Sequence, residues 1–184
     1  MLSRPKMSQT VYFHVDVRPF THGDIIPPAG KFIDRHKPIG TAMEELLRLT
    51  APKGSPERGK QLFVFENEDC ARYHCIKTAG GRLYRVTLEG TITHRGDMAL
   101  LDEIGATLDE PERNRLANQY WAGDPGPKPC IEVMIPKAKV VDEIVLTRAD
   151  RRAIMQKAGF RFADFSKETD DDLPFVDMKP KGET

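Results

Sequence analysis

The sequence predicts a protein of the α+β class, from the order of its strand and helix patterns and from its composition. Strand-like and helix-like segments follow one another without strict strand–helix–strand alternation, which does not favour a doubly wound parallel sheet. The chain has 184 residues, 39% of them hydrophobic, so one domain with a sizeable core is expected. Its 28 basic and 28 acidic residues cancel, which argues against a general binder of polyanions.

The first predicted elements are a strand and a short helix separated by a loop. Apolar and polar side chains alternate over residues 10–18, which is the pattern of a strand and places His14 on its polar face. Pro19 ends this strand, and the Gly- and Pro-rich stretch that follows is predicted to be a long loop. A helix is expected over residues 41–49, because its apolar positions fall on one side.

The middle of the chain is predicted to continue as strand, helix and strand. Residues 61–65 have the pattern of a buried strand with Phe63 and Phe65 on one face. The acidic residues after it suit the start of a helix ending at Gly80, since they meet the positive end of the helix dipole. Alternating apolar side chains predict a further strand over residues 82–88.

Two helices are predicted next. Residues 98–104 form a short apolar segment with helical spacing. Asp109 and Glu112 form a capping-box pattern, which predicts a second helix running to Gly123 with Tyr120 on its inner side.

The last part of the chain is predicted to hold two strands, a basic helix and a tail. The strands cover residues 131–135 and 140–146, and the basic helix covers residues 148–158. A single domain is therefore expected over residues 1–158. Residues 159–184 are acidic and poor in apolar side chains, which predicts a mobile C-terminal tail.

The sequence contains no feature that indicates a membrane segment, a secretory signal or a metal centre. No apolar stretch approaches the roughly 20 residues that cross a bilayer, so we expect a cytoplasmic protein without a membrane partner. Cys70, Cys75 and Cys130 lack zinc-ligand spacing, and we expect reduced thiols. His74 near two of these cysteines is a weak indication of a ligand set, so no metal is predicted.

Three segments with candidate chemistry lie on separate predicted strands. The first contains His14, followed nine positions later by a Gly-Asp pair. The second is the aromatic strand at residues 63–65, which leads into a helix, and the third starts with Glu132 and continues as an apolar run. In this order and spacing the segments resemble the ADP-ribosyltransferase superfamily, notably its rifampin-modifying and DNA-modifying toxin members. The resemblance covers roughly residues 10–146.

The resemblance implies a split β-sheet with short peripheral helices that binds NAD through residues on three strands. It implies that His14 binds a ribose hydroxyl of NAD, a task that suits an imidazole because one ring nitrogen can donate while the other accepts. The backbone of Val15 would hold the nicotinamide carboxamide, with Asp16 beside it in the cofactor site. His22, in the loop after the strand, is the competing candidate for the NAD-binding histidine.

The other two motifs supply an aromatic platform and a carboxylate. Phe63 falls where the family has a Tyr that stacks under nicotinamide, and Phe65 is the second candidate for that contact. Glu132 is implied as the catalytic residue that stabilises the oxocarbenium-like ribose and can take a proton from the acceptor. Cys130 stands where arginine-specific members carry Glu or Gln, so arginine is not the expected acceptor.

The residues by themselves leave other roles open. His14 could be a strand histidine without a function, and Phe63 and Phe65 could be plain core residues. Glu132 could be an exposed strand residue that pairs with Lys128 or Arg85.

The function that the resemblance implies is transfer of ADP-ribose from NAD, used as co-substrate, to a macromolecule with release of nicotinamide. The acceptor would be a protein or a nucleic acid, and a bacterial or phage toxin or effector with a neutralising partner protein fits this class. Two alternatives remain open. One is an NAD glycohydrolase, and the other is a catalytically silent module that binds a partner through the basic helix that begins at Arg148.

Overall fold

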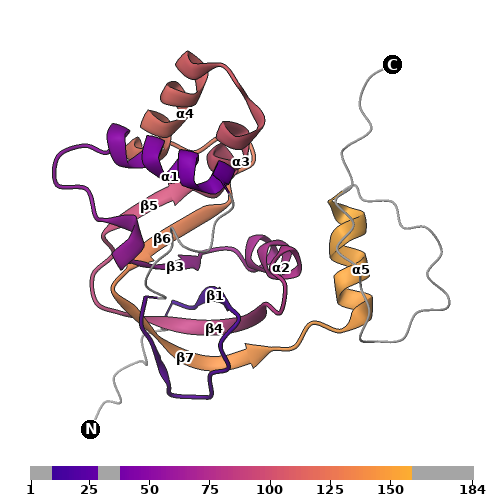
Figure 1. The fold of residues 1–184 in the computed structure, drawn as a ribbon. Coiled ribbons are helices and arrows are strands. Elements are labelled where there is room, and N and C mark those ends of the chain that lie inside the picture. The colour runs from indigo at the N-terminus through magenta and orange to yellow at the C-terminus, as the bar shows by residue number, and fades with distance from the viewer. Residues whose placement is uncertain (1–9, 29–37, 159–184) are drawn as a thin grey trace, which may run out of the picture. The chain divides into compact units, whose positions relative to one another are not determined.

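The computed structural model describes residues 10–28 and 38–158 (Figure 1). The chain divides into two units, residues 1–145 and residues 146–184. Helix α5 (Arg148–Lys157), which we predicted inside a single domain ending at residue 158, belongs to the second unit. The predicted C-terminal tail lies outside the described residues.

The first unit is built on an antiparallel sheet, which has seven strands in the described part of the chain. The strands are β1 (Tyr12–Asp16), β2 (Ile25–Ile26), β3 (Leu62–Phe65), β4 (Arg82–Glu89), β5 (His94–Asp97), β6 (Ile131–Ile135) and β7 (Lys137–Ile144). Their order across the sheet is β2-β7-β4-β1-β3-β6-β5. Together with the helices, this sheet confirms the predicted α+β class.

The described helices of the first unit are α1 (Pro38–Thr50), the 3₁₀ turn η2 (Arg58–Lys60), α2 (Glu68–Lys77), α3 (Met98–Ala106) and α4 (Glu110–Ala122). Three of them, α2, α3 and α4, begin at side-chain caps that the sequence offers. The side chain of Asn67 accepts hydrogen bonds from two backbone amides at the start of α2. Asp109 caps α4, and Gly123 ends it in the left-handed conformation with φ of 69°. These caps explain why the predicted limits of α2 and α4 are close to the observed ones.

Three short elements were not predicted from the sequence. The two-residue strand β2 lies within the stretch predicted to be a loop, where it pairs with β7. Strand β5 has the sequence His-Arg-Gly-Asp, which carries no alternation of apolar side chains, and its pairing with β6 defines it as a strand. The turn η2 is too short to have a period of its own.

The burial of β1 is opposite to the prediction. His14 was expected on the polar face, but His14 and Asp16 are each only 6% exposed. Val11 and Val17, on the face expected to be buried, are 39% and 45% exposed just beyond the ends of the strand. The reason is the central position of β1 between β4 and β3, where its polar side chains find hydrogen-bonding partners inside the protein.

The sheet has two halves that meet between β1 and β3. One registered pair, Phe13 opposite Phe65, joins these two strands, whereas β1 and β4 share five registered pairs. Figure 1 shows β5 and β6 running obliquely to β1, β4 and β7. Side chains from both halves share one apolar cluster, which includes Val64 and Val133 from one half and Tyr84 from the other. The two halves therefore enclose a common core.

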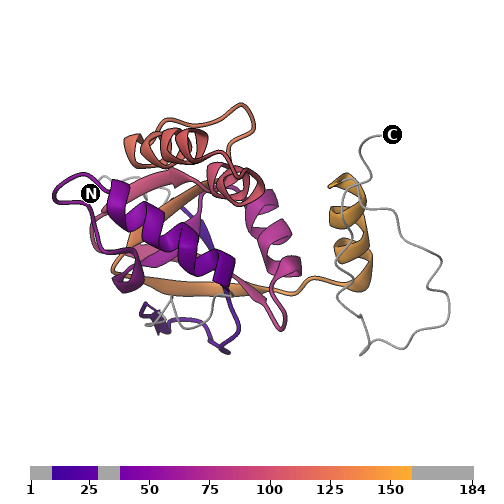
Figure 2. The same ribbon diagram turned by 45° about the horizontal axis from the view of Figure 1, so that its top comes forward.

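A second core lies between the helices and the half of the sheet that contains β6. Helices α1, α3 and α4 contribute Leu47, Leu101, Leu116 and Trp121, which pack with Met134 of β6. Figure 2 shows these three helices gathered on one side of the first unit. The elements around β6 are thereby covered and kept away from water. Among the described helices, none has the length and apolarity to span a lipid bilayer.

Candidate functional site

The three strands that carry the sequence motifs are neighbours in the sheet. Strand β3 lies between β1 and β6. Phe65 of β3 is opposite both Phe13 of β1 and Glu132 of β6. His14, the aromatic pair of β3 and Glu132 are therefore brought to the junction of the two half-sheets, although they are far apart in the sequence.

His14 links β1 to β3 where the registered pairing of the two backbones ends. Its Nδ1 is 2.7 Å from the carbonyl oxygen of Phe63. Because a carbonyl oxygen can only accept, Nδ1 carries the proton in this hydrogen bond. The other ring nitrogen, Nε2, faces Oδ2 of Asp16 at the longer distance of 3.3 Å. The ring is thus held through Nδ1, and Nε2 is the nitrogen with the weaker contact.

Asp16 is a charged partner beside His14. Arg18 donates to its carboxylate from the backbone amide at 2.9 Å and from Nη2 at 2.6 Å. Burial by itself would raise the pKa of Asp16, but the hydrogen bonds from His14 and Arg18 outweigh it and hold that pKa well below its ordinary value. Val15, which lies between His14 and Asp16 in the sequence, pairs with Leu83 of β4.

Glu132 is buried and is held by two side chains from other elements. The hydroxyl of Tyr120 on α4 donates to Oε1 at 2.6 Å, and Nη1 of Arg58 donates to the same oxygen at 3.0 Å. The surface ion pairs considered from the sequence are wrong, because Glu132 is 5% exposed and Arg85 pairs with Asp142 instead. The carboxylate therefore belongs to an internal polar cluster.

This Glu132 cluster consists of Glu44, Arg58, Tyr120 and Glu132. Nε of Arg58 lies 3.1 Å from Oε2 of Glu44, and its Nη1 also donates to the Tyr120 hydroxyl. Burial would lower the pKa of Arg58, but the neighbouring carboxylates of Glu132 and Glu44 raise it, so the guanidinium stays charged. In this cluster one guanidinium therefore faces two carboxyl groups, those of Glu44 and Glu132.

Burial and the charge of Glu132 raise the pKa of the Tyr120 phenol. The phenol therefore keeps its proton and remains a hydrogen-bond donor at neutral pH.

The two phenylalanines of β3 lie in different surroundings. Phe63 is half-buried, and the Arg58 guanidinium lies 4.7 Å from its ring centroid. Phe65 is 3% exposed and packs on the His74 ring of α2 at 5.2 Å. Phe65 is thus a core residue, whereas Phe63 lies next to the Glu132 cluster through Arg58.

His74 is an additional titratable group close to the site. Burial lowers its pKa, while the negative charge of Glu132 opposes this shift and the His14 ring adds to it. The imidazole is therefore within the electrostatic influence of both motif residues, although the sequence offered it only as a weak metal ligand.

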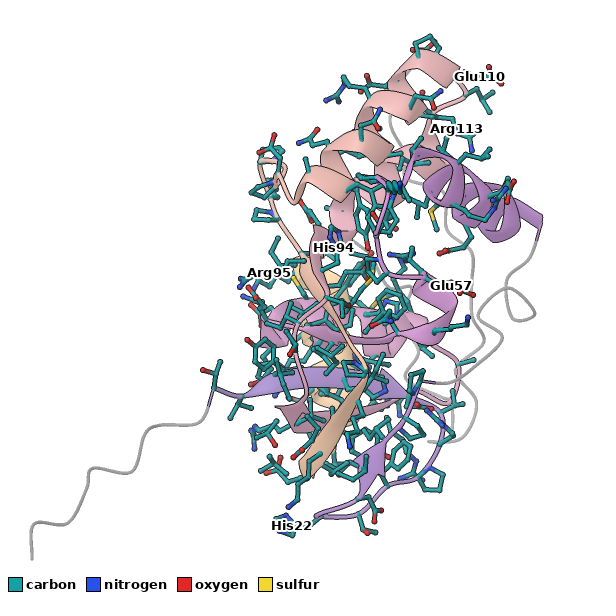
Figure 3. All side chains as sticks on the ribbon, turned by 90° about the vertical axis from the view of Figure 1, so that its left-hand side faces the viewer. His22, Glu57, His94, Arg95, Glu110 and Arg113 are labelled. Carbon is teal, nitrogen blue, oxygen red and sulfur yellow. The ribbon has the colours of Figure 1, made fainter. Side chains whose placement is uncertain are left out.

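His22 lies outside this cluster. Its Nδ1 is 2.6 Å from the carbonyl oxygen of Val141 on β7, in an exposed part of the chain. Figure 3 shows His22 at the end of the molecule away from His94, whose ring packs on Tyr120 at 5.2 Å. Of the two candidate histidines, His14 is the one near Phe63 and the strands that carry the other motifs.

Sequence reasoning missed that Glu44, Arg58 and Tyr120 form one polar cluster with Glu132. Glu44 gave a signal, since it precedes Leu47 by three positions and so lies on the apolar side of a predicted helix, where a charge needs a partner. Tyr120 gave another, because a phenol on the inner side of a helix needs an acceptor. Arg58 follows a Gly- and Pro-rich stretch and carried no such signal.

A search with models of protein families finds none that matches the chain. A search of curated proteins likewise finds no significant match.

Proposed function

We propose that the protein transfers ADP-ribose from NAD to a macromolecular acceptor and releases nicotinamide. The observation that carries this proposal is the position of His14, Phe63 and Glu132 on the adjacent strands β1, β3 and β6. Each motif is weak by itself, and the resemblance implies that all three act at one site. Their adjacency supports the function that the sequence resemblance implies.

The charge of the Glu132 cluster suits this reaction. The bond between the ribose C1′ and the nicotinamide nitrogen breaks with its electron pair going to the nitrogen, so positive charge passes from the pyridinium to the ribose. A buried cluster with two carboxylates and one guanidinium stabilises such a cation electrostatically. The acceptor then bonds to C1′, and its proton is lost to Glu132 or to water.

His14 would serve as the ribose ligand in this proposal. Its Nδ1 is tied to the Phe63 carbonyl at 2.7 Å, which fixes the orientation of the ring. A ribose hydroxyl would replace the contact of Nε2 with Asp16, which is long at 3.3 Å. Phe63 would offer its ring to nicotinamide.

A second candidate function is a catalytically silent binding module on the same fold. The observation that favours it is the burial of Glu132 and His14, which are 5% and 6% exposed and already contact protein partners. Buried polar groups that are satisfied in this way often serve the fold rather than a reaction. In that case Glu132 would affect stability only.

Release of nicotinamide from NAD by the purified protein separates these candidates. We expect release by the wild type and a loss of turnover of about a hundredfold or more in Glu132→Gln, since the amide keeps the shape but loses the charge. The variant should also be about 1–3 kcal/mol less stable, because the Arg58 guanidinium loses one buried charged acceptor while it keeps Glu44. Absence of release by the wild type would contradict both enzyme candidates.

The acceptor is found with labelled NAD and a whole-cell extract. Label that becomes sensitive to protease or to nuclease identifies a protein or a nucleic acid as the acceptor. Release of nicotinamide without transfer of label would instead indicate an NAD glycohydrolase.

A further inference from the structure

We infer that Tyr120 is a positioning residue that orients the carboxylate of Glu132, and that Gly96 leaves the space for its ring. This inference rests on the proposed function. It assigns a role in the reaction to a helix residue outside the three strand motifs.

The first observation is the direction of the hydrogen bonds to Glu132. Among the described residues, Tyr120 and Arg58 donate hydrogen bonds to Glu132, and both bonds end on Oε1. Because these two side chains hold Oε1, the carboxylate can turn little. Oε2 is then the oxygen that a ribose hydroxyl would meet. A fixed carboxylate needs less reorganisation in the transition state than a mobile one.

The second observation is the glycine on the neighbouring strand. Gly96 of β5 is paired with Glu132 of β6. A Cβ atom at position 96 would collide with the Tyr120 ring. Only a residue without a side chain therefore lets the phenol of α4 reach across β5 to the carboxylate.

The third observation is the packing that holds the phenol in place. The Tyr120 ring stacks edge-on against Trp121 at 5.4 Å and lies 5.2 Å from the His94 ring. The side chain is fully buried, so its hydroxyl has one orientation in which both Arg58 and Glu132 are satisfied.

The test is Tyr120→Phe, which keeps the ring and removes the hydroxyl. We expect a fall in kcat of about tenfold for nicotinamide release, the size of one lost hydrogen bond to a charged group. The KM for NAD and the affinity for NAD in calorimetry should stay within about twofold, because Tyr120 acts through Glu132 and does not touch NAD.

Tyr84→Phe is the matched control. Tyr84 is fully buried as a residue, as Tyr120 is, and it lies in the other core cluster. The change removes a phenol hydroxyl that donates to the Arg18 carbonyl. This control should lower the melting temperature and leave kcat unchanged. Gly96→Ala is a second variant, which displaces the ring while the hydroxyl remains, and should lower kcat in the same way as Tyr120→Phe.

The outcomes separate the role of Tyr120 from the proposed function. If Glu132→Gln is inactive while Tyr120→Phe keeps its kcat, the positioning role is overturned and the proposed function stands. An equal loss of kcat in Tyr84→Phe also overturns the role, because the effect would then reflect lost stability. A wild type that releases no nicotinamide overturns the proposed function, and the role of Tyr120 falls with it.

Discussion

At the scale of single residues, the protein surrounds its candidate reactive groups with fixed partners. His14 is held at Nδ1 by the Phe63 carbonyl, and Glu132 is held at Oε1 by Tyr120 and Arg58. In the proposed reaction these contacts limit the motion of the ribose ligand and of the carboxylate. The cost is that NAD must compete with Asp16 for Nε2 of His14.

The two candidate histidines are expected to behave differently toward NAD. His14→Ala should abolish measurable NAD binding, because it removes the proposed ribose ligand and the link between β1 and β3. His22→Ala should bind NAD as the wild type does, since its ring lies in an exposed part of the chain and contacts Val141. Isothermal titration calorimetry measures both. Loss of binding in His22→Ala alone would show that the loop histidine is the ligand.

At the scale of elements, the two aromatic side chains of β3 lie in different surroundings, one in the core and one at the candidate site. Phe65 is 3% exposed and packs on α2 through His74, whereas Phe63 is half-buried beside Arg58. Both lie on one face of the strand, as the alternation predicted, and their neighbours decide which of them is available to a ligand.

Substitutions of these two residues should separate stability from binding. Phe65→Ala should cost about 3–5 kcal/mol of stability, because it leaves a cavity in a closed part of the core. Phe63→Ala should cost less and should abolish NAD binding, whereas Phe63→Tyr should bind NAD normally because it keeps the stacking surface. Thermal melts measure the stability of the three variants, and calorimetry measures their affinity for NAD. A Phe63→Ala protein that melts much lower but binds NAD normally would assign Phe63 to the core.

At the scale of the whole molecule, titratable groups lie against the helix-covered core of the first unit. The helix-covered core meets the Glu132 cluster through Tyr120, and His94 packs on Tyr120 and Trp121. Burial lowers the pKa of His94 below its ordinary value of 6.5, and burial has the same effect on His74. Nε2 of His94 has no hydrogen-bond partner among the described residues, so a proton there would be unpaired.

Stability should therefore fall in mild acid. Unfolding restores the ordinary pKa of 6.5 to both imidazoles, so below that pH the unfolded chain binds more protons than the folded protein does. The stability that the neutral rings supply is complete well above pH 6.5 and is lost as the pH falls from that value through the lowered pKa of the folded protein. Asp16 and the other carboxylates whose pKa is lowered change the stability mainly below about pH 4.5. They therefore contribute little to the loss of stability that the histidines cause.

Urea unfolding at intervals between about pH 8 and pH 5 measures this loss. The double variant His74→Gln and His94→Gln should flatten the dependence, and His22→Gln, which changes an exposed ring, should retain it. An equally steep dependence in the double variant would exclude the two buried histidines as its source.

The order of strands and helices was predictable from the sequence because alternation, helical spacing and caps are properties of neighbouring residues. The α+β class, strands such as β6 and helices such as α4 follow from them. Strand β5 did not follow, because its residues carry no alternation and only pairing with β6 makes them extended. The burial of His14 could not be predicted from the sequence either, because it depends on the position of β1 between β4 and β3.

The sequence by itself determined which residues could carry chemistry, namely His14, Phe63 and Glu132, and that they lie on separate strands. Only the tertiary structure decided their neighbours. Arg58 pairs with Glu132 across 74 positions of the chain, and His14 reaches Phe63 across 49. Contacts at such separations leave no local pattern, because they arise from the order of strands in the sheet and from the packing of helices on its face.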